Sequence, residues 1–155
     1  MRLADTYITQ YPKLQSYVEN DIAALADVPL IVNAIKKFSG QTSMATIRRG
    51  LSWGTPPHIK IVPGLKCGGS EAYGCYAWGS SNIQIDYWHA QSFEVGADLR
   101  PTRNGTMVHR VGVILLHELT HWADAQDGID DVIPDDPSNE EGHAFEREVY
   151  GHIIW

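Results

Sequence analysis

The segment Leu116-His117-Glu118-Leu119-Thr120-His121-Trp122 carries two histidines four positions apart, with a glutamate directly after the first. Residues four apart on an α-helix lie on the same face, so His117 and His121 can present two imidazole nitrogens to one metal ion. Glu118 lies beside that face, where it can accept a proton from a water molecule held by Zn²⁺. The segment therefore predicts a catalytic zinc site with two histidine ligands and Glu118 as the general base.

The residues before this segment are largely apolar: Val108, Val111, Val113, Ile114, Leu115 and Leu116. They predict a buried helix from about Thr106 to Asp124. A buried helix seldom carries two histidines and a glutamate without a partner for them, because uncompensated polar groups are costly to bury. This context favours a metal site over the alternative of a surface helix with two unrelated histidines.

Catalytic zinc takes three protein ligands and keeps one position open for water, so a third ligand is required. A second helix, predicted from Asn139 to Tyr150 and ending near Gly151, offers several acids. Glu141 is the preferred ligand, because its small and apolar neighbours would pack against the metal helix. Glu146 and Glu140 are the alternatives on the same helix.

Asp127 is a rival ligand from the intervening loop, because it lies ten residues after His117, as the last ligand does in the HExxHxxGxxH/D arrangement. That arrangement needs glycine at the seventh position to turn the chain sharply, and here the position is Asp124. If it is no ligand, Asp127 or Asp124 could instead hold a histidine N–H.

Upstream of the metal helix, the hydrophobic pattern changes from helical to alternating, which predicts an α+β fold in a single domain over residues 1–155. The expected helices cover residues 12–26, residues 28–38 with Asp27 as the cap, and a short stretch at 45–49. The expected strands cover residues 58–62, 73–78 and 82–88, with a hairpin turn at 79–81 and a loop at 96–105. Trp78, Tyr87 and Trp88 are expected mainly in the core or on a sheet face.

The composition is that of an ordinary globular domain of 155 residues with a net charge of −7. An acidic chain is a poor partner for nucleic acid or an anionic membrane. No stretch of the sequence approaches the roughly 18 apolar residues of a membrane-spanning helix. The N-terminal residues lack the basic-then-apolar pattern of a cleaved secretion signal, so we expect a cytoplasmic protein, one exported by another route, or a piece of a longer chain.

Cys67 and Cys75 are separated by the glycine-rich stretch Gly-Gly-Ser-Glu-Ala-Tyr-Gly. They could form a disulfide across a hairpin in an oxidising compartment, or remain two thiols. Their spacing is not that of a zinc-binding cysteine pair.

The stretches HELTHWADAQDG (residues 117–128) and EEGHAFEREVYG (residues 140–151) resemble the gluzincin branch of the zincin metallopeptidases. They are most similar to small metallopeptidase toxin domains of bacterial polymorphic toxins and type VI secretion effectors. The resemblance implies a zincin-like fold in which the C-terminal helix supplies the third ligand. It also implies a small mixed or antiparallel sheet whose edge strand, expected at Ile83–Tyr87, pairs with an extended protein or peptide substrate. A toxin of this kind would be secreted or delivered into a target cell, with a secretion carrier or an immunity protein as possible partners.

The resulting hypothesis is hydrolysis of peptide bonds by a zinc-activated water, with Glu118 moving the proton. The oxyanion also needs a donor, and Tyr150 is the first candidate, followed by His143, Arg147 and His109. One alternative is a hydrolase of the peptide or amide links of the bacterial cell wall. Another is a binding or regulatory module without turnover, which the intact Glu118 disfavours.

Overall fold

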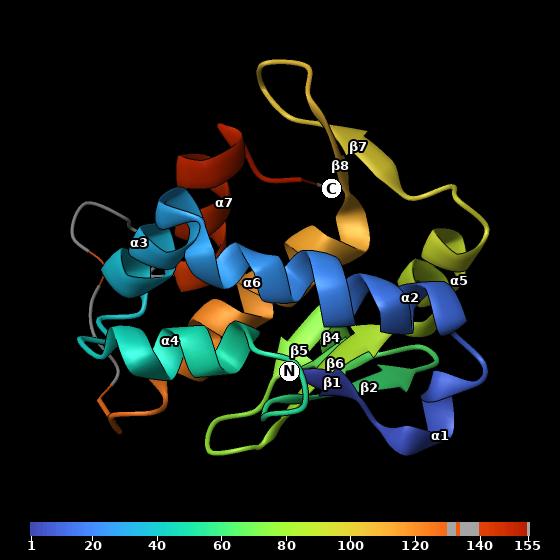
Figure 1. Cartoon of the computed structure of the whole chain (residues 1–155), viewed down its shortest axis with the longest axis horizontal. Coiled ribbons are helices and arrows are strands. Elements are labelled where there is room, and N and C mark those ends of the chain that lie inside the picture. Colours follow the sequence, from blue (N-terminus) through green and yellow to red (C-terminus); the bar gives the residue numbers. More distant parts are fainter. Residues whose placement is uncertain (130–132, 134–139, 155) are drawn as a thin grey trace.

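The computed structural model describes residues 1–129, 133 and 140–154, and these form a mixed α+β fold (Figure 1). The helices are α1 (Asp5–Ile8), α2 (Pro12–Tyr17), α3 (Pro29–Phe38), α4 (Met44–Leu51), α5 (Tyr87–Glu94), α6 (Arg110–Asp124) and α7 (Glu141–Tyr150). A π-helical turn (Val18–Ile22) and a 3₁₀ turn (Leu25–Asp27) continue from α2. The strands are β1 (Arg2–Leu3), β2 (His58–Val62), β3 (Lys66–Cys67), β4 (Ser70–Glu71), β5 (Gly74–Tyr76), β6 (Asn82–Asp86), β7 (Leu99–Pro101) and β8 (Met107–His109).

The main sheet has the strand order β1-β2-β6-β5, in which β5 alone runs antiparallel to its neighbour. Isoleucines alternate along the two central strands, and Ile59, Ile61, Ile83 and Ile85 are all buried. The alternation puts these four side chains on one face of the sheet, which is the face that packs against the core. The sequence-based prediction of a mixed sheet is thus confirmed, as is the hairpin that joins β5 and β6.

The identity of the edge strand was predicted wrongly. Ile83–Tyr87 was expected to be the edge, but β6 lies between β2 and β5, and the outer strand is β5. The sequence pattern does not reveal this order. Strands β2 and β6 pair directly and in parallel, although β3, β4 and β5 lie between them along the chain. The predicted strand at 82–88 is also shorter, since Asp86 caps α5 by accepting a hydrogen bond from the Trp88 amide.

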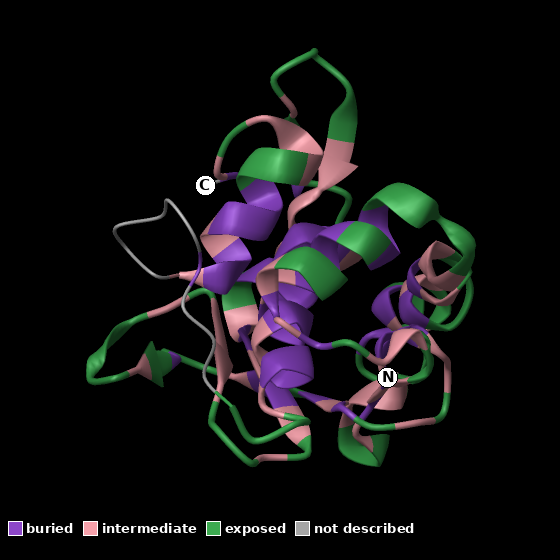
Figure 2. Ribbon diagram, turned by 90° about the vertical axis from the view of Figure 1, so that its left-hand side faces the viewer, coloured by how far each residue is buried: buried purple, intermediate pink, exposed green. Residues whose placement is uncertain are grey.

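Helix α6 is the centre of the fold, and all but three of its 15 residues are buried (Figure 2). It packs against β5 and β6 on one side and against α3, α4 and α7 on the others. The predicted helix began at about Thr106, but residues 107–109 form the strand β8 instead. This strand pairs with β7, which lies within the loop expected at residues 96–105. The predicted cap at Asp27 is wrong as well, because α3 begins after Val28 and has no side-chain cap.

Helix α7 crosses α6 and also contacts α3. It ends at Gly151, whose φ of 81° is a left-handed conformation that favours glycine, as the sequence predicted. Gly142 is required for a different reason: a Cβ atom there would lie 2.3 Å from Cδ2 of His117. The glycine therefore lets the first turn of α7 approach the metal helix.

Two of the aromatic residues expected in the core are on the surface. Trp78 is 56% exposed and Trp88 is 69% exposed, whereas Tyr87 packs partly buried against the core. In the part of the chain that the structure describes, no helix has the length and apolar character needed to cross a membrane.

Candidate metal centre

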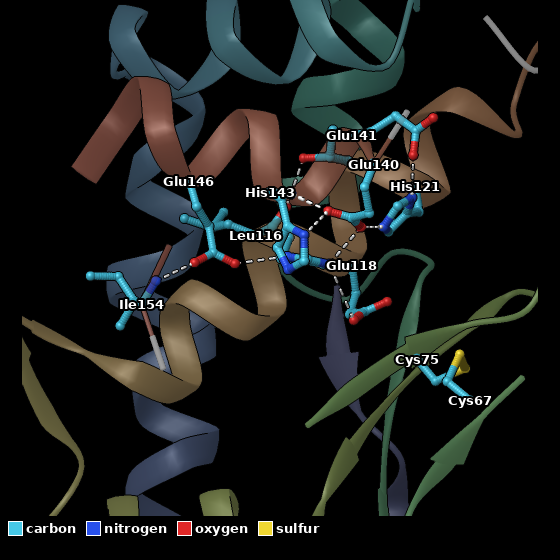
Figure 3. Close-up of polar contacts among 12 residues, drawn as sticks. Cys67, Cys75, Leu116, Glu118, His121, Glu140, Glu141, His143, Glu146 and Ile154 are labelled. Atoms are coloured by element: carbon cyan, nitrogen blue, oxygen red, sulfur yellow. Dashed lines mark hydrogen bonds and ion pairs between the residues drawn. A yellow bond between two sulfur atoms is a disulfide. The ribbon is translucent and has the colours of Figure 1, made fainter. Parts of the chain in front are cut away.

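Three potential metal ligands converge between α6 and α7. The Nε2 atoms of His117 and His121, one helical turn apart, lie 3.1 Å and 2.7 Å from the same oxygen, Oε1 of Glu140 (Figure 3). The three ligand atoms all fall within 4.8 Å of one another. Two imidazole nitrogens and one carboxylate oxygen form a donor set typical of catalytic zinc. The side chains present therefore fit a divalent metal ion.

The second oxygen of Glu140 is fixed by the start of α7. Glu140 is the N-cap residue, and its Oε2 accepts a hydrogen bond from the His143 amide and lies 3.0 Å from Nδ1 of His143. Such capping holds a carboxylate at the positive end of a helix. One oxygen is thus anchored, and the other is directed towards the two histidines.

Glu141, the preferred ligand in the sequence analysis, occupies a different position. Its Oε2 lies 2.9 Å from Nδ1 of His121, on the side of the ring opposite to the nitrogen that faces Glu140. The preference between adjacent residues depends on where the helix begins, and sequence locates helix ends only within one or two positions. The carboxylate that faces both Nε2 atoms is thus that of Glu140 and not that of Glu141.

The remaining two candidate ligands lie outside the converging trio. Oε1 of Glu146 is 2.8 Å from Nδ1 of His117, and its Oε2 accepts a hydrogen bond from the Ile154 amide at 2.6 Å. Asp127 is exposed and accepts a hydrogen bond from the Ile129 amide instead.

Each of the two histidines is therefore held by a carboxylate at Nδ1, the ring nitrogen that does not face Glu140. A carboxylate at Nδ1, from Glu146 for His117 and from Glu141 for His121, leaves each Nε2 directed towards Glu140. Histidines that bind metals commonly give the other ring N–H to such a carboxylate, which fixes the tautomer and the ring orientation. The sequence suggested Asp124 or Asp127 for this role, but the structure gives it to two residues of α7.

Electrostatics in this cluster reflect burial and close pairing. Burial alone would lower the pKa of His117, but its hydrogen bonds with Glu140 and Glu146 outweigh burial and raise the pKa to about 10. For His121, bonds with Glu140 and Glu141 likewise overcome burial and raise the pKa to about 9. Despite its own burial, Glu140 has a lowered pKa because both histidines bond to it. The imidazoles and the Glu140 carboxylate thus stabilise one another's charged forms.

Glu118 is buried next to the trio, with Oε1 3.9 Å from Nε2 of His117. Burial raises the pKa of Glu118, an effect that the nearby His117 and His121 oppose. A carboxyl group with a raised pKa close to a metal site is suited to general base chemistry. Gly74 of β5 makes room for it, since a Cβ there would lie 2.5 Å from Oε1 of Glu118.

Two cavities of about 450 Å³ each meet at this point, and Gly74, His117 and Glu118 line both of them. The first is bordered by apolar side chains, including Ile114 and Ile154. The second also contains the acidic side chains of the metal cluster and the exposed Trp78. Both cavities therefore border the candidate metal centre.

The candidate oxyanion donors are not all brought to the site. Tyr150 packs against Phe145, and burial raises its pKa. It lines a separate cavity with Arg103 rather than either cavity at Glu118. His109 is paired with Asp98, and Arg147 is exposed. Of the four candidates, His143 alone lines the first cavity, with its ring 5.3 Å from that of His117.

Cys67 and Cys75 form a disulfide, which answers a question that the sequence left open. Their Cα atoms are 5.6 Å apart, within the usual range for such a bond. The bond joins β3 to β5, on the sheet side of the metal cluster (Figure 3).

The α+β fold, the histidine pair and the carboxylate that faces both nitrogens define a protein equipped to hold a catalytic metal ion. Residues 7–151 match the family model described as metallopeptidase toxin 3, and the chain belongs to this family. The resemblance to metallopeptidase toxin domains found in the sequence is thereby confirmed. No curated protein and no solved structure matches the chain.

Proposed function

We propose that this chain is a single zincin-like domain that hydrolyses peptide bonds with Zn²⁺ held by His117, His121 and Glu140. The observation that carries the proposal is the convergence of two Nε2 atoms on one carboxylate oxygen, with Glu118 buried beside them. Zinc bound by such a set supplies Lewis acidity, which makes a water molecule easier to deprotonate and a carbonyl easier to attack.

In this mechanism, Glu118 accepts a proton from the attacking water and delivers it to the leaving amine. Its buried position supports this role, because burial raises the pKa of the Glu118 carboxyl group and so makes its carboxylate a stronger base. Glu141 and Glu146 orient the two histidines and keep the proton on Nδ1 of each ring. We assign oxyanion stabilisation to His143 rather than to Tyr150, because His143 lines the cavity next to Glu118.

We further propose that an extended segment of a protein substrate binds along β5. The Tyr73 carbonyl accepts a hydrogen bond from the Asp86 amide. Because hydrogen-bonded positions alternate along an antiparallel pair, the main-chain groups of Tyr73 and Cys75 face β6. The main-chain groups of Gly74 and Tyr76 then face the outer edge, and the Tyr76 amide donates a hydrogen bond to the Glu118 carboxylate. An edge strand beside the general base can align a peptide by main-chain hydrogen bonds, and among the described residues no strand pairs with the outer side of β5.

The family supports a biological role as a toxin delivered into target cells, with a protein as its substrate. An immunity protein that covers the two cavities would protect the producing cell. Hydrolysis of cell-wall peptide links remains an outcome of the assay below.

The test is zinc content and affinity of the purified wild type and of Glu140→Gln, Glu141→Gln and Asp127→Asn. Cleavage of an unfolded protein and of cell-wall fragments is assayed on the same samples. Glu148→Gln is the matched control, since Glu148 lies on the same helix but pairs with Lys37 on the surface.

We expect about one zinc ion per wild-type chain, with binding lost in Glu140→Gln and only weakened in Glu141→Gln. Asp127→Asn and the control should resemble the wild type. Loss of zinc in Glu141→Gln with retention in Glu140→Gln would reverse the ligand assignment. A zinc-loaded wild type that cleaves neither substrate would refute the enzymatic proposal.

A further inference from the structure

The small hairpin formed by β3 and β4 lies outside the main sheet. Its two strands have two residues each, pairing Lys66 with Glu71 and Cys67 with Ser70. All of these side chains except that of Cys67 are exposed. A hairpin of this size buries too little surface to maintain a fixed position by itself.

This hairpin nevertheless borders both cavities at the candidate metal centre. Glu71 lines the first cavity, and Cys67 lines the second. Gly74, just beyond the hairpin, lies where the two cavities meet at Glu118. A peptide that binds along β5 therefore lies next to the hairpin. The position of the hairpin then determines the shape of one wall of the substrate cleft.

The base and the tip of the hairpin are attached to the fold by different means. At the base, Leu65 is buried, its amide donates to Oδ2 of Asp86 at 3.0 Å, and its carbonyl accepts from the Ala72 amide at 3.1 Å. Beyond the base, the covalent attachment is the bond from Cys67 to Cys75. Cys75 belongs to β5 and pairs with Gln84 of the central strand β6.

We propose that the Cys67–Cys75 disulfide positions the β3–β4 hairpin as a wall of the substrate cleft, so that its reduction weakens peptide binding without removing the metal. The inference rests on the proposed function for its effect on peptides. In the reduction, two electrons and two protons from a dithiol convert the sulfur–sulfur bond into two thiols, and the dithiol becomes a disulfide. The peptidase would then work best in an oxidising compartment, where disulfides persist.

Neither cysteine is a metal ligand candidate in the cluster, and His117, His121 and Glu140 come from α6 and the start of α7. Loosening the hairpin tip should therefore leave the metal cluster intact. The anchored base at Leu65 should also limit the disturbance to residues 66–71. We expect KM to rise by roughly three- to tenfold, the scale of re-ordering one or two side chains on binding, with kcat nearly unchanged.

The experiment compares zinc-loaded wild type, oxidised and after reduction with a phosphine, with the Cys67→Ser/Cys75→Ser double variant. A phosphine is used because thiol reductants compete for zinc; with one water molecule it reduces the bond and becomes a phosphine oxide. The measurements are kcat and KM for a peptide, zinc content, the number of free thiols, and amide hydrogen exchange of residues 66–71. The double variant should resemble reduced wild type and should not respond to the phosphine.

The expected result is faster exchange at residues 66–71 and a higher KM on reduction, with zinc content and kcat retained. Unchanged exchange or unchanged KM, with two free thiols present, would overturn the inference. Loss of zinc on reduction would also overturn it, because the bond would then support the metal centre itself. Absence of cleavage in every zinc-loaded sample would refute the proposed function instead, while the exchange data would still decide whether the disulfide holds the hairpin.

Discussion

Two regions face each other across the site. One is the helical layer of α6 and α7, the other is the strand side formed by β3–β5, and the two differ in burial. In the helical layer, Glu118, Glu141 and Glu146 are 4–6% exposed, and each lies close to one of the two histidines. On the strand side, Tyr73 is 44% exposed and Trp78 is 56% exposed. A metal centre needs ligands fixed within a fraction of an ångström, which buried helices provide.

The strand side serves a different requirement. A surface that receives different peptide sequences must stay accessible, and its contacts can adjust as the substrate binds. The comparison implies that changes in the helical layer alter metal binding or rate, whereas changes on the strand side alter peptide binding or local stability. The following predictions test this division.

Replacement of the general base should produce the largest effect. Glu118→Gln keeps the size of the side chain but cannot accept the proton, so we expect kcat to fall by roughly 10²–10⁴-fold. Zinc content should stay at the wild-type level, because Glu118 is not one of the three converging ligands. Steady-state kinetics with metal analysis measures both, and Glu148→Gln is the control. A variant with near-normal kcat would remove Glu118 from the mechanism.

Gly74→Ala tests the boundary between the two regions. The added Cβ would lie 2.5 Å from Oε1 of Glu118 and 2.7 Å from a methyl group of Ile114, so the carboxylate must move. Displacement of a catalytic group by about 1 Å can cost on the order of 10²-fold in rate. We expect that loss in kcat with zinc retained. Ala77→Ser, an exposed neighbour beyond β5, serves as the comparison, and equal activity in the two variants would disprove the close contact.

Glu146→Gln tests the support of the metal ligands. Glutamine keeps an acceptor oxygen but removes the negative charge at Nδ1 of His117, and mutation of such a partner typically weakens metal affinity by about 10–100-fold. Competition with a chelator measures the affinity. Far-ultraviolet circular dichroism should show an unchanged helical content. Affinity equal to that of the wild type would mean that the ring of His117 is held by packing alone.

The smallest effect concerns His89, which packs edge-on against Tyr73 on the strand side. Burial, with help from Arg110, lowers its pKa from 6.5 to about 4. The folded protein thus disfavours the charged form, so His89 contributes to a loss of stability as the pH falls from about 6.5 towards 4. Melting temperatures over this range should fall less steeply for His89→Gln than for the wild type. Parallel curves would show that His89 does not titrate in this way.

The sequence predicted the parts of the fold whose pattern is local. The helical period that predicted a helix from about Thr106 to Asp124 and the glycine at 151 both follow from neighbouring residues. Helix α6 ends at Asp124 and α7 at Gly151 as expected, although α6 begins only at Arg110. The β5–β6 hairpin is also a local feature. The strand order and the exposure of Trp78 and Trp88 were missed, because they depend on segments that are distant in the sequence. The β7–β8 hairpin is as local as the β5–β6 hairpin, but residues 96–105 lack an alternating apolar pattern and were expected to form a loop.

By itself, the sequence determined that His117, Glu118 and His121 lie together on a buried helix, because a four-residue spacing fixes side-chain direction within one helix. The tertiary structure decided which acid faces the two Nε2 atoms. Glu140 and Glu141 are adjacent in the chain, but the first caps α7 and the second lies within it, so they reach opposite sides of the His121 ring. The disulfide and the place of β5 at the end of the main sheet were likewise decided by packing, since no local pattern specifies which strands become neighbours.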